Sequence, residues 1–90
     1  MVGKERINMK IDSNVVEKFE NENTGVIPDD LEIIHASSKK YDNDFTDDTD
    51  IMYKVILIDD NGEIFTYIKF ENEYNETLNS KWFRKGYNYV

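Results

Sequence analysis

Two strand-like segments separated by an Asn-Gly dipeptide constrain the fold of this chain more than any other feature. Residues 51–59 and 63–71 are both rich in β-branched and aromatic side chains, as strands are. The dipeptide Asn61-Gly62 between them is typical of a two-residue type I′ turn, in which both residues have positive φ. The sequence therefore predicts an antiparallel hairpin with its turn at Asn61-Gly62.

A two-residue turn would also set the register of the hairpin. Ile58 would lie opposite Phe65, and Val55 opposite Ile68. Both faces of the hairpin would then be largely apolar, whereas a small antiparallel sheet usually leaves one face in water. We therefore expect the second face to be covered, either by the chain's own helices or by a second copy in a homodimer.

The segments before the hairpin predict a strand, a helix, a second strand and a loop. Residues 7–11 alternate between apolar and polar side chains, which indicates a short strand. A polar N-cap and apolar residues at helical spacing predict a helix over residues 13–21. Residues 31–38 have a strand pattern, and residues 39–50, which show no periodicity, are expected to form an acidic loop.

The end of the chain supports two interpretations. Tyr74, Leu78 and Trp82 are four residues apart and a glycine follows, so we expect a short helix over residues 75–85. The alternative is a last strand over residues 82–90, where aromatic residues recur.

Ninety residues are the size of one domain. The predicted architecture is α+β, with about four strands in a small antiparallel sheet and two short helices. We expect residues 1–90 to form this single domain, with residues 1–6 disordered.

The residue content excludes several kinds of site. The chain has no cysteine, which excludes disulfides, thiol catalysis and cysteine-bound zinc. A segment beginning at Asp42 resembles a calcium loop, but Asp47 and Tyr53 stand where an EF-hand has glycine and glutamate. The single histidine, His35, has no nucleophile motif around it. We therefore expect no enzyme activity, no metal and no cofactor.

No segment is marked for a membrane or for secretion. The apolar runs fall far short of the about 20 residues that a membrane span needs, and the first residues lack the apolar core of a signal peptide. We therefore expect no membrane contact and a cytoplasmic location.

The distribution of charge is the main functional clue. The net charge is −8, from 19 acidic and 11 basic residues, which argues against direct binding to nucleic acid. A β-strand rises about 3.3 Å per residue, close to the about 3.4 Å per charge along one DNA strand, so carboxylates on a strand can imitate a phosphate backbone. The alternative is a set of solvated acidic faces that keep a small protein soluble. The carboxylates expected to contact a partner are Asp42, Asp44, Asp47, Asp48, Asp50, Asp59, Asp60, Glu63, Glu71 and Glu73.

In its size, acidity, strand content and lack of cysteine, the chain resembles the small acidic proteins with which bacteriophages disable DNA-binding proteins of their hosts. That class includes inhibitors of uracil-DNA glycosylase, RNA polymerase, CRISPR nucleases and the histone-like protein HU. Residues 55–63 resemble the late hairpin of the glycosylase inhibitors.

The resemblance implies a non-enzymatic DNA mimic that occupies the DNA-binding surface of a basic host protein. That target would be a polymerase, a nuclease or HU, whose two-fold symmetry a dimeric mimic would match. The alternative is an immunity-type protein that neutralises one basic nuclease.

Overall fold

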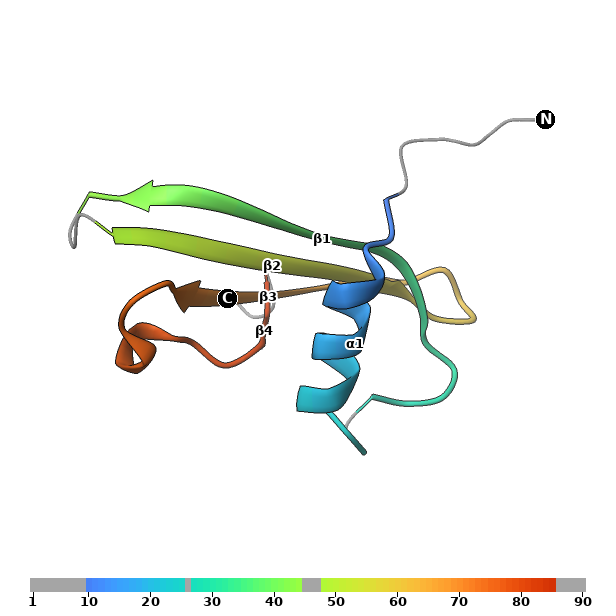
Figure 1. Ribbon diagram of the computed structural model, residues 1–90. Coiled ribbons are helices and arrows are strands. Elements are labelled where there is room, and N and C mark those ends of the chain that lie inside the picture. The colour runs from blue at the N-terminus through green and yellow to red at the C-terminus, as the bar shows by residue number, and fades with distance from the viewer. Residues whose placement is uncertain (1–9, 26, 45–47, 86–90) are drawn as a thin grey trace.

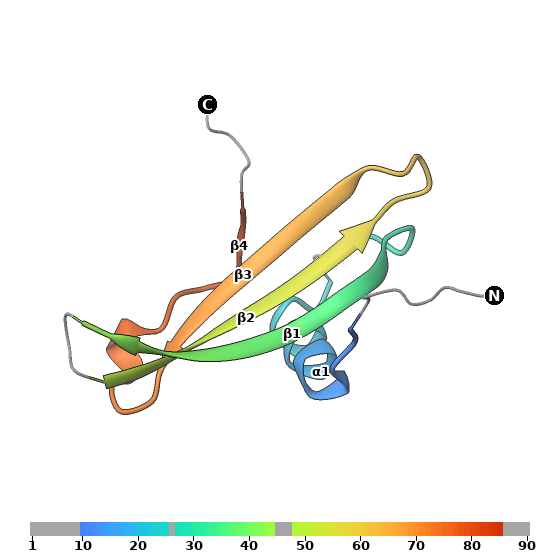
Figure 2. The same ribbon diagram turned by 90° about the horizontal axis from the view of Figure 1, so that it is seen from above.

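The computed structural model describes residues 10–25, 27–44 and 48–85. The fold is α+β: a four-stranded antiparallel sheet in the order β1-β2-β3-β4, with one α-helix on one side of it (Figures 1 and 2). The elements are α1 (Ser13–Glu22), β1 (Glu32–Asn43), β2 (Asp48–Ile58), β3 (Ile64–Asn72), the 3-10 turn η1 (Glu76–Leu78) and β4 (Phe83–Arg84).

The predicted first helix is confirmed by α1. Its N-cap is Asp12, whose side chain accepts a hydrogen bond from the backbone N–H of Asn14. Val15 and Phe19, four residues apart, are the buried residues of α1 and point to the sheet. No helix in the described residues has the length and apolar character required to cross a membrane.

The hydrophobic core lies between α1 and the sheet. Phe19 is fully buried and packs with Val55 and Leu57 of β2. Its ring also contacts Tyr67 and Trp82, with centroids 5.5 Å and 4.9 Å away. Helix, sheet and the segment before β4 therefore share one core, organised around a single phenylalanine.

The prediction of an acidic loop over residues 39–50 is wrong. β1 continues to Asn43 and β2 begins at Asp48, so the two strands form a long ribbon in which Tyr41 pairs with Asp50. The alternation of the ribbon is hidden in the sequence because its side chains are mostly lysine and aspartate, which have low strand propensity. Tertiary pairing overrides that propensity, and Tyr41 packs edge-on against Phe70 on β3.

The turn between β2 and β3 has three residues, so the predicted two-residue turn and its register are wrong. Ile58 pairs with Ile64 instead of Phe65. The N–H of Gly62 donates to the carbonyl of Asp59 at 3.1 Å, and Gly62 has a positive φ of +86°. This is the geometry of a type I turn followed by a glycine bulge. The observed register places Tyr67 opposite Val55, where it contacts the core.

The predicted helix over residues 75–85 is also wrong. The chain makes only the 3-10 turn η1 and then continues in extended form to β4. Tyr74 and Leu78 are 74% and 46% exposed, so two of the three residues of the expected apolar face do not pack into the core. The alternative of a strand over residues 82–90 is realised at β4, and residues 86–90 lie outside the described residues.

The beginning of the chain is described only from Lys10. Ile11 forms an isolated parallel bridge with Ala36 of β1, and the predicted strand over residues 7–11 is otherwise outside the described residues, as is the segment 1–6. The face of the sheet opposite α1 carries no helix from the described residues (Figure 1). The expectation that the chain's own helices cover both faces is therefore not met there.

Candidate functional site

The predicted carboxylates lie at two opposite ends of the sheet. Asp42 and Asp44 are at the end where β1 leads to β2, whereas Asp59, Asp60 and Glu63 are at the turn between β2 and β3 (Figures 1 and 2). β2 connects these ends with 11 residues, a span of about 33 Å at about 3.3 Å per residue. The structure therefore brings the predicted residues together as two groups, not as one continuous row.

Asp50 is part of the interior of the sheet. Its carboxylate accepts a 2.7 Å hydrogen bond from the side-chain amide of Asn72, and both residues are buried, with 8% and 6% exposed. Burial raises the pKa of Tyr41, and the charge of Asp50 and a hydrogen bond to it raise this pKa further. Asn72 also accepts hydrogen bonds from the N–H groups of Tyr74 and Asn75. Asp50 therefore holds the start of the segment that follows β3.

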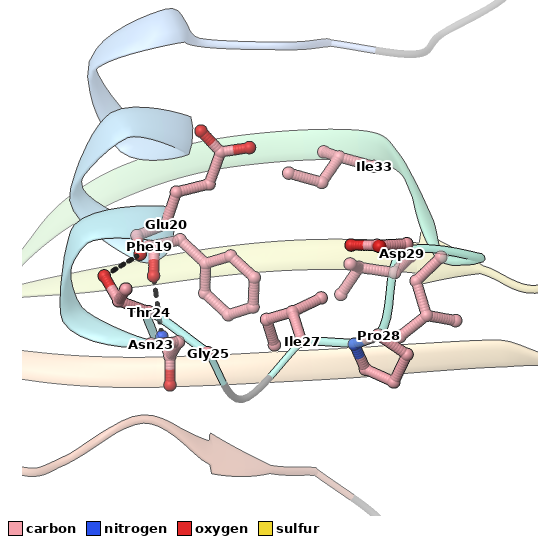
Figure 3. Close-up of a pocket in the computed structure, with 11 residues that line it drawn as sticks. Phe19, Glu20, Asn23, Thr24, Gly25, Ile27, Pro28, Asp29 and Ile33 are labelled. Atoms are coloured by element: carbon pink, nitrogen blue, oxygen red, sulfur yellow. Dashed lines mark hydrogen bonds between the residues drawn. The ribbon is translucent and has the colours of Figure 1, made fainter.

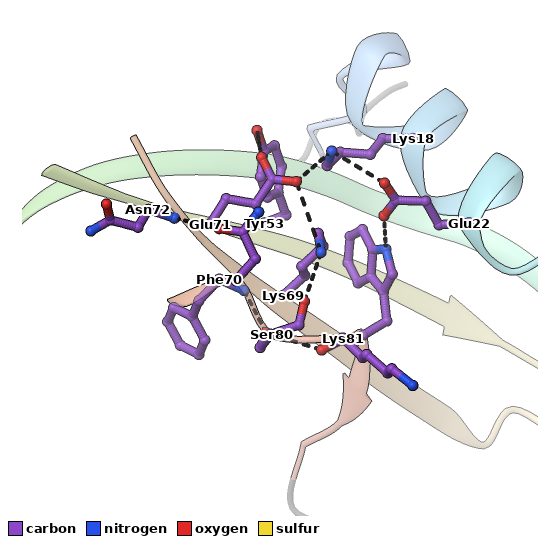
Figure 4. A network of polar contacts seen from close by, with 11 residues as sticks. Lys18, Glu22, Tyr53, Lys69, Phe70, Glu71, Asn72, Ser80 and Lys81 are labelled. Carbon is purple, nitrogen blue, oxygen red and sulfur yellow. Dashed lines mark hydrogen bonds and ion pairs between the residues drawn. The ribbon is translucent and has the colours of Figure 1, made fainter. Parts of the chain in front are cut away.

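Glu71 is held in a network of cations and a phenol (Figure 4). Its carboxylate lies 2.6 Å from the ammonium of Lys18 and 3.8 Å from that of Lys69, and it accepts a 3.2 Å hydrogen bond from the Tyr53 hydroxyl. Burial alone would lower the pKa of Lys18, but the hydrogen bond and charge of Glu71, followed by those of Glu22, outweigh burial and raise it. Glu71 therefore joins α1 to β2 and β3.

The same network fixes the segment that leads to β4. The indole N–H of Trp82 donates to Glu22 at 2.7 Å, and Lys69, which is 8% exposed, donates to the carbonyl of Ser80 at 2.7 Å. Ser80 also exchanges two hydrogen bonds with the backbone of Phe70, through its own N–H and its hydroxyl. These hydrogen bonds, and not a second helix, hold the segment before β4 against α1 and β3.

Asp59 stabilises the turn between β2 and β3. Its carboxylate accepts hydrogen bonds from the N–H groups of Asn61 at 2.9 Å and Glu63 at 2.8 Å. Such a side-chain cap favours this turn conformation over the two-residue form. Asp59 is thus fixed in position, and it remains only partly exposed.

The remaining predicted carboxylates that the structure describes are exposed. They are Asp42, Asp44, Asp60, Glu63 and Glu73. Asp48 is described through its backbone, as the first residue of β2, and Asp47 lies outside the described residues. Of the ten predicted residues, Asp50 and Glu71 are therefore engaged inside the fold.

Three acidic residues that the sequence analysis missed stand beside the turn. Glu32, the first residue of β1, pairs with Ile58, the last residue of β2, so the segment with Asp29 and Asp30 lies at the turn end of the sheet (Figures 1 and 2). Antiparallel pairing of residues 31–38 with 51–59 would have revealed this placement. We call the group the acidic turn end; its members are Asp29, Asp30, Glu32, Asp59, Asp60 and Glu63.

The two segments of the acidic turn end have the higher density of acidic residues. Six of the nine residues in 29–32 and 59–63 are acidic and none is basic. Among the described residues, the ion pairs join Lys18 or Lys69 to glutamates elsewhere in the fold. The apolar side chain of Ile64, 50% exposed, stands next to these carboxylates. An exposed apolar residue within an acidic rim is a favourable anchor for a protein partner.

A shallow hollow of about 320 Å³ lies near the same end, between the last turn of α1 and the segment that leads to β1 (Figure 3). Phe19, Ile27 and Ile33 are among its apolar lining residues, and Glu20 and Asp29 are its acidic ones. The lining is suited to an apolar side chain with a positive charge nearby.

His35 lies on the face of the sheet opposite α1. Its Nε2 is 2.9 Å from the hydroxyl of Ser37, two residues along the same strand. Burial lowers the pKa of His35, and the positive charges of Lys54 and Lys10 lower it further. A catalytic histidine of the serine hydrolase type is oriented by a carboxylate, whereas the charges that act on His35 are cationic. Within the described part of the chain, no three histidine, aspartate or glutamate side chains are grouped to hold a metal ion.

Comparisons with known proteins gave no match: no family model fits the chain, and neither curated proteins nor solved structures are similar to it.

Proposed function

We propose that the chain is a non-enzymatic DNA-mimic inhibitor that occupies the DNA-binding surface of a basic bacterial protein such as HU. The contact surface in this proposal is the acidic turn end. The observation that carries it is the meeting of two acidic segments, 29–32 and 59–63, with six carboxylates and no base between them. A protein that binds phosphates through lysine and arginine would be attracted to such a surface, more strongly at low salt.

The rigidity of the turn supports this proposal. A decoy for a polyanion-binding protein needs carboxylates in fixed positions, because each exposed ion pair is worth only about 0.2–1 kcal/mol and ordering flexible groups would cancel that gain. The Asp59 cap and the pairing of Glu32 with Ile58 provide fixed backbone positions for both acidic segments. A cytoplasmic location, which access to such a target requires, is part of the proposal.

Displacement of DNA from HU tests the proposal. Fluorescence anisotropy of a labelled duplex bound to HU should fall as the protein is added, and the effect should weaken with salt. In the test variant, Asp29→Asn, Asp30→Asn, Asp60→Asn and Glu63→Gln are combined. We expect a loss of about tenfold in competition, since four contacts of about 0.2–1 kcal/mol together contribute about 0.8–4 kcal/mol, a range that includes the 1.4 kcal/mol of one decade.

A matched control removes four charges from the opposite end of the sheet. It combines Asp44→Asn, Asp48→Asn, Glu73→Gln and Glu76→Gln, so its net charge of −4 (−8 plus 4) equals that of the test variant. Competition should change by less than about threefold in this control. Equal losses in both variants would show that only net charge matters and would contradict the proposed site.

The immunity-type alternative is favoured by one specific observation. Ile64 is half exposed within the acidic rim, which suits a single partner that offers it a pocket. In that case Ile64→Ser should weaken binding to one basic nuclease by more than about tenfold, and the wild-type chain should not displace DNA from HU. For a DNA mimic, the same substitution should change competition little, because its contacts are made by carboxylates that meet lysine and arginine.

A further inference from the structure

The outer edge of β1 presents backbone groups that can pair with another strand. β1 is the first strand of the sheet order and has 12 residues. Part of its outer edge is used: the N–H of Ala36 donates to Lys10 at 2.8 Å, and its carbonyl accepts from Asp12 at 2.9 Å. After Asp12 the chain enters α1, so no described residue continues this pairing beyond Ala36.

The alternation of a strand identifies the groups that remain at this edge. Successive residues direct their N–H and C=O groups to opposite sides in the plane of the sheet. Since Ala36 directs its groups outward, Ser38, Lys40 and Asp42 do so as well. These three residues are exposed. An open edge of this kind is a template for a further strand.

The side chains along this edge are complementary to a second copy in antiparallel orientation. If Tyr41 lies opposite Tyr41 of the second copy, Lys40 lies opposite Asp42 and Asp42 opposite Lys40. Both pairs are then formed by residues with outward backbone groups, which hydrogen bond in pairs. Opposite charges placed directly across two strands stabilise their pairing.

Neighbouring registers lack this complementarity. A shift by one residue sets outward backbone groups against inward ones, so the ladder does not form. Shifts by two residues place Lys40 opposite Lys40, or Asp42 opposite Asp42, and like charges directly across two strands are destabilising. The charge pattern therefore selects one register, with its two-fold axis at Tyr41.

Aromatic side chains support the same axis from the face opposite α1. Tyr41, which is 38% exposed, packs against Phe70 with ring centroids 6.3 Å apart. Phe70 in turn stacks on Phe83, which is 44% exposed, at 6.0 Å. Pairing at Tyr41 would bring two such rows together and bury apolar surface that is now in water.

We propose that two copies of the chain associate through antiparallel pairing of β1, centred on Tyr41, to give one continuous sheet of eight strands. The occupant of the edge is thus a second copy of this chain. The inference is independent of the proposed DNA-mimic function, because it concerns the β1 edge and not the acidic turn end.

Sedimentation of the full chain over a range of concentrations tests this proposal. The wild type should form a dimer, and Asp42→Lys, which sets Lys40 against a lysine twice, should weaken it at least about tenfold. The exchange Lys40→Asp with Asp42→Lys restores opposite charges and should recover the dimer to within about threefold. A wild type that stays monomeric, or a dimer insensitive to Asp42→Lys, overturns the proposal.

A backbone substitution and a crosslink provide further readouts. Lys40→Pro removes an outward N–H without breaking the pairing to β2, so it should weaken the dimer more than Lys40→Ala does. Because the chain has no cysteine, Tyr41→Cys introduces one thiol that can form a disulfide only with its counterpart. Mild oxidation should crosslink two copies of the Tyr41→Cys variant, but not two copies of the Ser38→Cys variant. Equal effects of the proline and alanine variants, or equal crosslinking of both cysteine variants, contradict the predicted axis.

Discussion

Replacement of Glu71 by alanine should destabilise the fold substantially, even though an isolated glutamate on a sheet is usually dispensable. The substitution leaves the ammonium groups of Lys18 and Lys69 without the carboxylate they share, and it removes the acceptor of the Tyr53 hydroxyl. The side chains of Glu71, Lys18 and Lys69 are 21%, 26% and 10% exposed. They therefore lie between surface ion pairs, worth about 0.2–1 kcal/mol, and buried pairs, whose disruption costs about 3–5 kcal/mol.

This intermediate burial sets the expected magnitude. We expect a loss of about 2 kcal/mol in the free energy of unfolding, which corresponds to a fall of about 2 M in the urea midpoint at an m value of about 1 kcal/mol/M. The control is Glu73→Ala, two residues along the chain, where the exposed side chain should cost less than about 0.5 kcal/mol. Equal midpoints for the two variants would refute the structural role of Glu71.

Three further predictions follow from the core, the turn and the histidine. Phe19→Ala removes the central ring of the core and should lower the free energy of unfolding, measured by urea titration, by about 3–5 kcal/mol. Loss of the native fold would agree with this prediction, whereas an unchanged urea midpoint would contradict it. Gly62→Ala should cost about 1 kcal/mol, although no atom lies within 4 Å of the added carbon, because φ is +86°; a loss below about 0.3 kcal/mol would contradict the turn geometry. The pKa of His35 is lowered in the fold, so the unfolded chain takes up a proton first as pH falls below about 6.5, and stability should fall through that window. His35→Gln should show a smaller fall in urea midpoint than the wild type over that range, and an identical fall would assign the effect to other groups.

The local patterns of the sequence predicted those elements whose residues alternate or repeat clearly. The helix at Val15 and Phe19, and the two apolar strands on either side of Asn61-Gly62, have strong periodicity, and all three elements are present. The exact turn was not predictable from its dipeptide alone, because the carboxylate of Asp59 selects a three-residue form.

Long-range contacts decided the elements that local patterns missed. The ribbon up to Asn43 forms because β2 pairs with it, although its lysines and aspartates are poor strand formers. The spacing of Trp82 predicts a helix, yet its side chain enters the core beside Phe19 and donates to Glu22, 60 positions away. Contacts at such separation leave no signal in a window of a few residues.

The residues of the candidate site also divide into those that local patterns predict and those that long-range pairing decides. The exposure of Asp60 and Glu63 follows from their place in a turn, and this was predictable. The capture of Asp50 by Asn72 was not predictable, because it depends on the register of β2 and β3. The contribution of Asp29 depends likewise on the pairing of β1 with β2, which charge counting along the chain does not reveal.

The most direct test of the proposed function maps the contact on the isotopically labelled chain. Amide chemical shifts should be recorded as unlabelled HU is added at low salt, and again after excess duplex DNA. If the acidic turn end is the contact surface, the largest shift changes should lie in residues 29–32 and 59–64. These shifts should return to their free values when DNA displaces the labelled chain from HU. Shifts confined to the opposite end of the sheet, at residues 39–44 and 48–50, or the absence of any shift, would contradict it.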